Sequence, residues 1–244
     1  MKCIILAAGY ATRLYPLTEN QPKALLAVGE KTILSHIMDK VEQLEEIDEV
    51  FIVTNDRFLK NFQSWQKTYK PKKATHIISN GTKTNEERLG AVRDMHFAVQ
   101  HKNIYNDVLL IAGDNLFEFS LKQFVDFFRE KNASAIALYN IKDKSKAAKK
   151  LGVAVIDNNN RITDFEEKPA QPKSSLAATC CYLLKRESLR KLQEYIHAGR
   201  KSDHPGDFIG WLGQQEMLYG FAFTESWFDI GSPESLERAN EAYR

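Results

Sequence analysis

Short apolar runs alternate with segments of helical period along this chain, and that alternation limits its fold more than any other feature. A short apolar run bounded by turn residues is typical of a strand that is buried on both faces. Between the first two runs, Ile33, Ile37 and Val41 recur at helical spacing, which predicts an amphipathic helix. The sequence therefore predicts an α/β fold whose mostly parallel sheet is covered by helices on both faces. The expected strands are residues 3–7, 50–53, 108–112, 135–139 and 178–184.

Three segments modify this plan. Residues 152–167 contain two apolar stretches around a turn-rich Asn-Asn-Asn-Arg, which predicts a hairpin and hence a mixed sheet. Thr84 is followed three residues later by Glu87, the pattern of a capping box, so we expect a helix that starts near Thr84. Ser232 before Pro233 predicts the start of the last helix, with a hydroxyl cap and a proline at the first helical position.

Composition indicates an ordinary soluble globular protein. The chain has 244 residues, 43% of them hydrophobic, and a net charge of +2, which allows a full core and argues against a nucleic-acid partner. No linker-like stretch divides it, so we expect a single domain over residues 1–244. The lysine-rich stretch 142–150 is interpreted as a solvated helix face. The apolar N-terminal run ends at Gly9 without a cleavage site, which predicts neither signal peptide nor membrane span and favours a cytoplasmic location.

Cysteine and histidine patterns do not indicate a zinc site. The cysteines lie in apolar runs without CxxC or CxxH spacing and are expected to be buried, reduced thiols. No two histidines have ligand spacing, so each is interpreted as structural or exposed. A Ser/His/Asp hydrolase is also disfavoured, because the chain has no GxSxG elbow. The residues concerned are Cys3, Cys180, Cys181, His36, His76, His96, His101, His197 and His204.

A long loop follows the first expected strand, in LAAGYATRLYPLTENQPKALL. A loop at the carboxyl end of a buried strand is a common ligand site in open α/β sheets. Small residues around Gly9 let backbone amides approach phosphate oxygens, which Arg13 and Lys23 can also bind. Gly9 alone is equally consistent with a simple turn, but the three residues together favour a phosphate site. The spacing matches neither GxxxxGK[ST] nor GxGxxG.

Charged residues also end three later segments. Asp114 in AGDN and Asp229 in WFDIGSPE each follow an apolar stretch, so both carboxylates can meet at one sheet edge and hold Mg²⁺ against triphosphate oxygens. In FEEKP, Lys168 can bind a phosphate monoester. Taken singly, each aspartate can also be a turn residue and Lys168 a surface lysine. Transfer between phosphates needs positioning and charge neutralisation rather than a general base, which these groups supply.

Taken in order, these four segments resemble those of the sugar-1-phosphate nucleotidyltransferases, also called nucleoside-diphosphate-sugar pyrophosphorylases. The resemblance covers residues 1–236. It implies an enzyme with a Rossmann-like mixed sheet, the nucleotide-diphospho-sugar transferase fold, that joins a nucleoside triphosphate to a sugar 1-phosphate and releases pyrophosphate. It further implies a nucleotide-binding part at about residues 1–115 and an acceptor-binding part at about 116–244. The short chain resembles members without a C-terminal β-helix, and a homo-oligomer is left open.

The resemblance also implies roles for individual residues. Arg13 would stabilise the departing pyrophosphate, Lys23 would serve the phosphates, and the carboxylates of Asp114 and Asp229 would hold magnesium. Lys168 would hold the acceptor phosphate and Glu167 the sugar hydroxyls. The remaining nucleotide-binding positions would be Leu6, Ala7, Ala8, Gly9, Thr12 and Gly90, and the remaining acceptor positions Asn115, Gly152, Ala178 and Thr179.

Three departures from the family pattern leave the substrates open. Ala11 stands where glycine is usual, which bears on the loop conformation. NEERLGA replaces the usual GTAGA, so that only Gly90 and Ala91 match and the base is not assigned. Cys180 replaces a common glycine beside the sugar pocket, so the acceptor is not assigned either.

Three other functions compete with this hypothesis. A cytidylyltransferase for an alcohol phosphate such as phosphocholine has a similar first loop. A non-catalytic regulatory subunit that binds a nucleotide sugar would not need all five charged residues, which the chain retains. A glycosyltransferase of related fold would need an Asp-x-Asp metal motif, which the sequence lacks.

Overall fold

A nine-stranded mixed sheet forms the centre of the protein. Its strands are β1 (Lys2–Leu6), β4 (Glu49–Thr54), β5 (Ala74–Ser79), β6 (Val108–Ala112), β8 (Ala135–Asn140), β9 (Val153–Ile156), β10 (Ile162–Glu166), β11 (Leu176–Leu184) and β12 (Tyr219–Phe223). The computed structural model describes all of residues 1–244. The strand order is β10-β9-β11-β6-β1-β4-β5, with β8 against β11 and β12 against β8.

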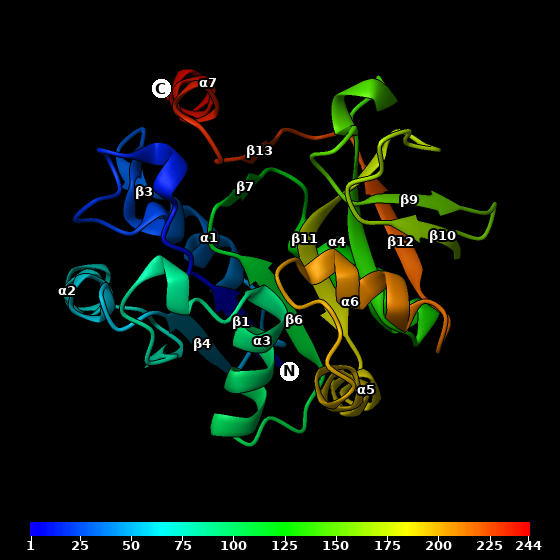
Figure 1. Ribbon diagram of the computed structural model, residues 1–244, viewed down its shortest axis with the longest axis horizontal. Helices are drawn as coiled ribbons and strands as arrows, with labels where there is room; N and C mark the ends of the chain where they lie inside the picture. The colour runs from blue at the N-terminus through cyan, green and yellow to red at the C-terminus, as the bar shows by residue number, and fades with distance from the viewer.

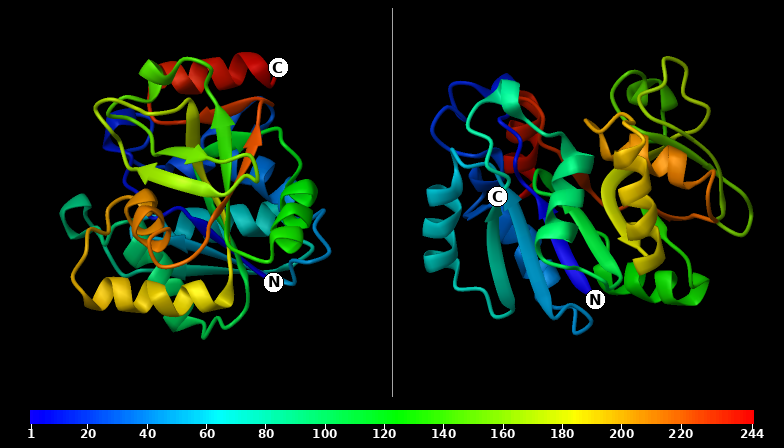
Figure 2. Two further views of the ribbon diagram at one scale, coloured as in Figure 1. Left: turned by 90° about the vertical axis from the view of Figure 1, so that its right-hand side faces the viewer. Right: turned by 60° about the horizontal axis from the view of Figure 1, so that its bottom comes forward.

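Strand direction divides the sheet into two parts. β6, β1, β4 and β5 run parallel, whereas β11 is antiparallel to both β6 and β8. The hairpin of β9 and β10 is antiparallel, as its sequence predicted. The right-hand view of Figure 2 shows the parallel N-terminal strands at one end of the molecule and the hairpin at the other.

Helices cover both faces of the sheet. They are α1 (Ile33–Val41), α2 (Leu59–Tyr69), α3 (Ala91–His101), α4 (Leu121–Lys131), α5 (Arg186–His197), α6 (Pro205–Leu212) and α7 (Pro233–Ala242). Consecutive strand residues face opposite sides, so Ile5 packs in one buried cluster with α1, α2 and α4, and Ile4 in another with α3, α5 and α6. In Figure 1, α3 and α6 lie in front of the sheet and α1 and α4 behind it. The predicted fold class is confirmed.

Two small ribbons complete the fold: β2 (Ala27–Val28) with β3 (Lys31–Thr32), and β7 (Asn115–Phe117) with β13 (Trp227–Asp229). α7, the C-terminal helix, packs against β2 and β13. It begins as predicted, because the Ser232 side chain accepts a hydrogen bond from the Ser235 amide and Pro233 is its first residue. None of the helices has the length and apolar character needed to cross a membrane.

The helix predicted to start near Thr84 begins later. Thr84 does not cap it, and the Glu87 carboxylate accepts a hydrogen bond from the Lys83 amide, 2.7 Å away. Only a 3-10 helix, Asn85–Glu87, forms there. The chain then turns at Gly90, whose φ of 88° is accessible to glycine, and α3 starts at the next residue.

Two other expectations need correction. The lysine-rich stretch forms a 3-10 helix, Lys144–Ala147, rather than an α-helix, because Lys142 and Lys149 adopt positive φ on either side of it. The cysteines are all free, but Cys180 is only half-buried whereas the other two are buried.

Candidate active site

The segment after β1 continues the edge of the sheet. The Ala7 amide donates a hydrogen bond to the Val53 carbonyl at 2.8 Å, and the Gly113 amide donates one to the Leu6 carbonyl at 2.8 Å. The buried Asn55 side chain donates to the Ala8 carbonyl at 3.0 Å. A Cβ at Gly9 would meet no atom within 4 Å. The segment is therefore fixed at its base and open in front of Gly9, where a ligand can approach the backbone.

Ala11, which stands where the family usually has glycine, lies in the next turn of this loop. Ala11 adopts a left-handed conformation with φ of 49°, which costs an L-residue with a Cβ about 1 kcal/mol relative to glycine. The Thr18 hydroxyl donates a hydrogen bond to the Ala11 carbonyl at 2.8 Å and holds the turn. The substitution thus leaves the loop in the conformation that glycine favours.

Two cations of the loop reach the other segments of the site. Lys23, in the 3-10 helix Lys23–Leu25, forms an ion pair with Asp114, the second residue after β6. Arg13 extends toward the segment after β13, because its Nη2 lies 3.7 Å from the position that a Cβ would take at Gly231. The loop therefore meets both aspartate segments.

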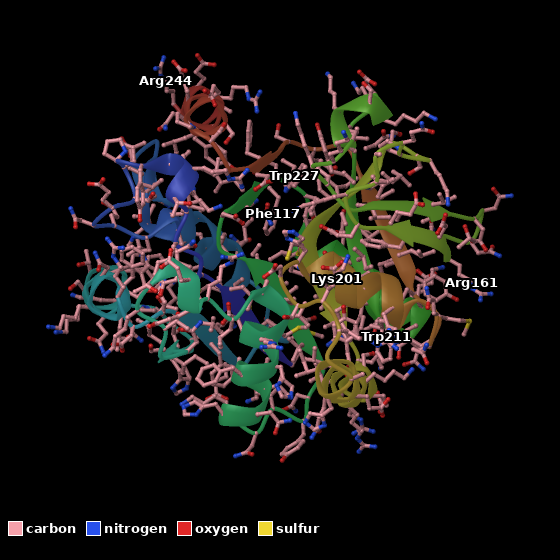
Figure 3. All side chains as sticks on the ribbon, in the orientation of Figure 1. Phe117, Arg161, Lys201, Trp211, Trp227 and Arg244 are labelled. Atoms are coloured by element: carbon pink, nitrogen blue, oxygen red, sulfur yellow. The ribbon has the colours of Figure 1, made fainter.

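The ribbon of β7 and β13 brings the two aspartates together. Asp229 is opposite Asn115, the residue after Asp114, and the Ile230 amide donates to the Asp114 carbonyl at 3.1 Å. Figure 3 shows Trp227 and Phe117, which are opposite each other in the same ribbon. Two carboxylates far apart in the sequence thus lie side by side at the carboxyl end of the parallel strands.

The pKa of Asp229 reflects the charged groups around its carboxyl group. Asp229 is exposed, but neighbouring protein atoms desolvate its carboxyl group in part. This desolvation, and then the negative charge of Asp114, raise the pKa of Asp229 to about 6. The positive charges of Lys23, Arg13 and Lys168 act on the same carboxyl and lower its pKa. All five charged residues selected from the sequence therefore gather at one place.

Glu167, which the sequence predicts to bind the acceptor, lies against two glycines. Its Oε2 atom is 2.7 Å from the position of a Cβ at Gly152 and 1.8 Å from that of a Cβ at Gly206. A side chain at either glycine would collide with the carboxylate. Burial raises the pKa of Glu167 to about 7, against the lowering effect of Lys168 and with a further raising effect from Asp207.

A bulge in β11 connects the two sides. Thr179, Cys180 and Cys181 together face only one residue of β8, and Cys180 has a φ of 53°. Burial raises the pKa of the Cys180 thiol, as do the negative charges of Asp114, Glu167 and Asp229, so the thiol lies among these carboxylates.

Two predicted acceptor residues are buried and bonded to protein. The Thr179 hydroxyl donates to the Ala137 carbonyl at 3.0 Å. The Asn115 side chain donates to the Thr179 carbonyl and accepts from Trp227 Nε1 at 3.1 Å. Their polar side-chain atoms thus join β11 to β8 and to the ribbon of β7 and β13. Ala178 is half-buried in β11, beside the bulge.

Two features of the site were not recognised from the sequence. His204 is exposed, in agreement with its interpretation from the sequence, but its position beside Lys168, with Nε2 2.9 Å from the lysine Nζ, was not predicted. Gly206, two residues later, adjoins Glu167. The run His-Pro-Gly-Asp, in which a helix-starting proline precedes a glycine, is the only local signal for this approach.

Gly90 faces a segment of the acceptor side. A Cβ at Gly90 would lie 2.5 Å from the Ser202 carbonyl oxygen. The Val92 amide at the start of α3 donates to that oxygen at 3.0 Å. The segment that precedes α3 is thus in contact with the chain that leads to His204.

A family model described as nucleotidyl transferase matches residues 2–244. The chain belongs to the nucleotidyl transferase family. The predicted enzyme class is thereby confirmed.

Curated relatives cover the chain almost completely. The bifunctional protein GlmU of Methanocaldococcus jannaschii is 30% identical over 243 residues, which are 99% of this chain and 54% of that protein. The chain spans about half the length of the GlmU relatives it matches. The UTP–glucose-1-phosphate uridylyltransferase AglF of Haloferax volcanii is 28% identical over 242 residues, 99% of this chain and 96% of that protein.

Solved structures confirm the nucleotidyltransferase fold. A putative glucose-1-phosphate thymidylyltransferase from Bacillus anthracis, solved with sucrose, superposes with a TM-score of 0.85 at 27% identity. The superposition covers 100% of this chain and 95% of the thymidylyltransferase chain. A UDP-glucose pyrophosphorylase with UDP-glucose has a TM-score of 0.81 at 21% identity and supports the fold alone.

Proposed function

We propose that the enzyme transfers a nucleotidyl group from a nucleoside triphosphate to the phosphate of a sugar 1-phosphate. The observation that carries this proposal is the approach of Lys23 to Asp114, of Arg13 to the segment after Asp229, and of that segment to the Asp114 backbone. The positive charge of Lys168 also acts on the Asp229 carboxyl. Three cations and two carboxylates at one sheet edge suit a polyphosphate with a divalent cation and a second phosphate beside it. The names of AglF and of the thymidylyltransferase favour a hexose 1-phosphate as the acceptor.

An oxygen of the acceptor phosphate attacks the α-phosphorus of the triphosphate in this reaction. The new P–O bond forms as the bond from the α-phosphorus to the pyrophosphate oxygen breaks, and pyrophosphate leaves with the bonding electrons. The acceptor phosphate is already ionised near neutral pH, so no general base is needed. Arg13 and Lys23 neutralise charge on the departing pyrophosphate, and Lys168 orients the acceptor phosphate.

The nucleotide lies along the first loop in this proposal. Backbone amides of the open segment around Gly9 approach the base and phosphates, together with Thr12. Gly90, just before α3, also contacts the nucleotide in this proposal. The Ser202 carbonyl fills the space that a Cβ of Gly90 would take. The segment comprises Leu6, Ala7, Ala8 and Gly9.

Asp114 and Asp229 fit a magnesium ion. They are adjacent carboxylates, and only Asp114 is paired with a lysine. The negative charge of one raises the pKa of the other, which a cation between them would relieve. Mg²⁺ commonly takes one or two carboxylates and completes its shell with phosphate oxygens and water. When bound, it would neutralise charge on the triphosphate.

The acceptor lies between Lys168 and the bulge of β11. Glu167 accepts hydrogen bonds from sugar hydroxyls. Gly152 makes room for its carboxylate, and Ala178 lies on the adjacent strand β11. We assign Asn115 and Thr179 to positioning, because their side chains are bonded to protein atoms.

The experiment that tests the function is a substrate grid. ATP, CTP, GTP, UTP and TTP are each combined with sugar 1-phosphates and with phosphocholine in the presence of Mg²⁺, and pyrophosphate release is measured. We expect release with a sugar 1-phosphate. Release only from CTP with phosphocholine would indicate a cytidylyltransferase, and no release with binding of a nucleotide sugar would indicate a regulatory subunit.

A further inference from the structure

Lys168 and His204 form a pair of nitrogen-bearing side chains without an acidic partner. The lysine Nζ lies 2.9 Å from Nε2 and 3.2 Å from Nδ1 of the imidazole. Nearly equal distances place the ammonium beside the ring between its two nitrogens, rather than along the lone pair of either one. Neither residue is paired with a carboxylate, in contrast to Lys23 at the other side of the site.

The backbone around His204 is held from two directions. The two residues before it are bound by the first amides of α3: Val92 donates to the Ser202 carbonyl at 3.0 Å and Ala91 to the Asp203 carbonyl at 3.3 Å. Two residues after it, Gly206 adjoins the Glu167 carboxylate. The imidazole is therefore attached to a positioned segment of the acceptor side.

We propose that His204 is a second ligand of the acceptor phosphate, beside Lys168. The inference rests on the proposed function. The Lys168 ammonium faces an imidazole rather than a carboxylate, and a phosphate dianion suits this pair because it accepts hydrogen bonds from both groups. Lys168 also acts on the Asp229 carboxyl, so a phosphate on this pair lies next to the reacting centre.

The charges around His204 predict proton uptake on phosphate binding. Burial lowers the pKa of His204, as do the positive charges of Lys168 and Arg88, while Asp207 and Asp203 raise it. The imidazole is thus neutral near pH 7 without ligand. A bound dianion favours the imidazolium, so affinity for phosphate increases as the pH falls from about 8 toward about 6. Below about pH 6 a phosphate monoester such as a sugar 1-phosphate itself takes up a proton, which ends the increase. Inorganic phosphate takes up its proton at a higher pH, so its affinity stops increasing earlier.

NMR titration of the imidazole tests the binding role without catalysis. Histidine ring signals of the full-length protein are followed from about pH 8 to about pH 5.5 with and without inorganic phosphate. The His204→Gln variant assigns the signal. We expect phosphate to move the His204 midpoint to higher pH and to leave that of His101, an exposed residue at the far end of α3, unchanged. An unchanged His204 midpoint at saturating phosphate would overturn the inference.

Steady-state kinetics with glucose 1-phosphate supply the second readout. In His204→Gln we expect KM for glucose 1-phosphate to rise about tenfold near pH 6.5, as for a lost hydrogen bond to a charged group. KM for the nucleotide should stay within about twofold. His101→Gln is the matched control, and equal KM values for the two variants would contradict the inference. If no sugar 1-phosphate is consumed but inorganic phosphate still moves the His204 midpoint, the proposed function is wrong, whereas His204 remains a phosphate ligand.

Discussion

The backbone amide of Ile230 donates a hydrogen bond to the carbonyl oxygen of Asp114, and the two atoms are 3.1 Å apart. This bond extends the ribbon of β7 and β13 by one step beyond the pairing of Asp229 with Asn115. A slip of one residue would turn Asp229 to the other face of the ribbon. The spacing of the two proposed metal ligands is therefore set by the register of a two-stranded ribbon whose strands are separated by more than a hundred residues.

Asp114→Asn should lose most turnover without unfolding the protein. The amide keeps the shape of the side chain but removes the charge that pairs with Lys23 and faces the proposed cation. We expect kcat to fall by about 10²-fold or more. Asp126→Asn on the exposed side of α4 is the control and should retain activity. A variant with near-normal kcat at saturating Mg²⁺ would remove Asp114 from the mechanism.

Arg13→Ala should reduce turnover by about 10²-fold, because the guanidinium reaches the segment after β13 where charge develops on pyrophosphate. Arg13→Lys should restore little of it, since a lysine lacks the planar fork that binds two oxygens. Arg190→Ala, an exposed arginine of α5, is the control. The measurement is kcat for pyrophosphate release, and full recovery in Arg13→Lys would show that a point charge suffices.

Glu167→Gln should stabilise the protein at high pH. The pKa of Glu167 is raised to about 7 in the folded state, above its ordinary value, so the folded protein favours the neutral carboxyl. Its contribution to stability is present at low pH and is lost as the pH rises through about 7. We expect the variant to have a higher Tm than the parent at about pH 8 and a similar Tm at about pH 5. Glu166→Gln, whose parent carboxylate pairs with Lys173, should not show this pH-dependent difference.

The α/β alternation was visible in the sequence because it rests on local patterns. The run 108–112 matches β6 residue for residue, and Ser232 and Pro233 begin α7 as their chemistry predicts. The meeting of Asp114 and Asp229 was also expected from the sequence, because both follow apolar stretches, although Asp229 reaches this place in a two-stranded ribbon rather than in the central sheet. These predictions depend on periodicity and capping, which a short window of residues contains.

Other features depend on contacts between distant segments and were not predicted. β12, in the sequence YGFAF, looks irregular but pairs with β8 and buries Phe223. The start of α3 is decided by Ser202 and Asp203, whose carbonyls accept its first amide hydrogens. His204 became a site residue only when α6 carried it to Lys168. Tertiary partners, rather than local preference, determine each of these.

Gly206→Ala should impair acceptor binding through Glu167. A Cβ at this position would lie 1.8 Å from the Glu167 Oε2 atom, so the carboxylate must move away from the sugar hydroxyls that we assign to it. We expect KM for the sugar 1-phosphate to rise about tenfold, while KM for the nucleotide stays within about twofold. Gly213→Ala, at the end of the same helix, is the control, because its Cβ would make an ordinary contact of 3.4 Å with Leu218.

A double-mutant cycle separates this effect from a general disturbance of α6. In a Glu167→Ala background the carboxylate is gone and the added methyl group meets no Glu167 oxygen. Gly206→Ala should then change KM for the sugar 1-phosphate by less than about twofold relative to Glu167→Ala alone. If the two substitutions are instead additive, the glycine acts independently of Glu167, and the close approach of the two residues does not shape the acceptor site.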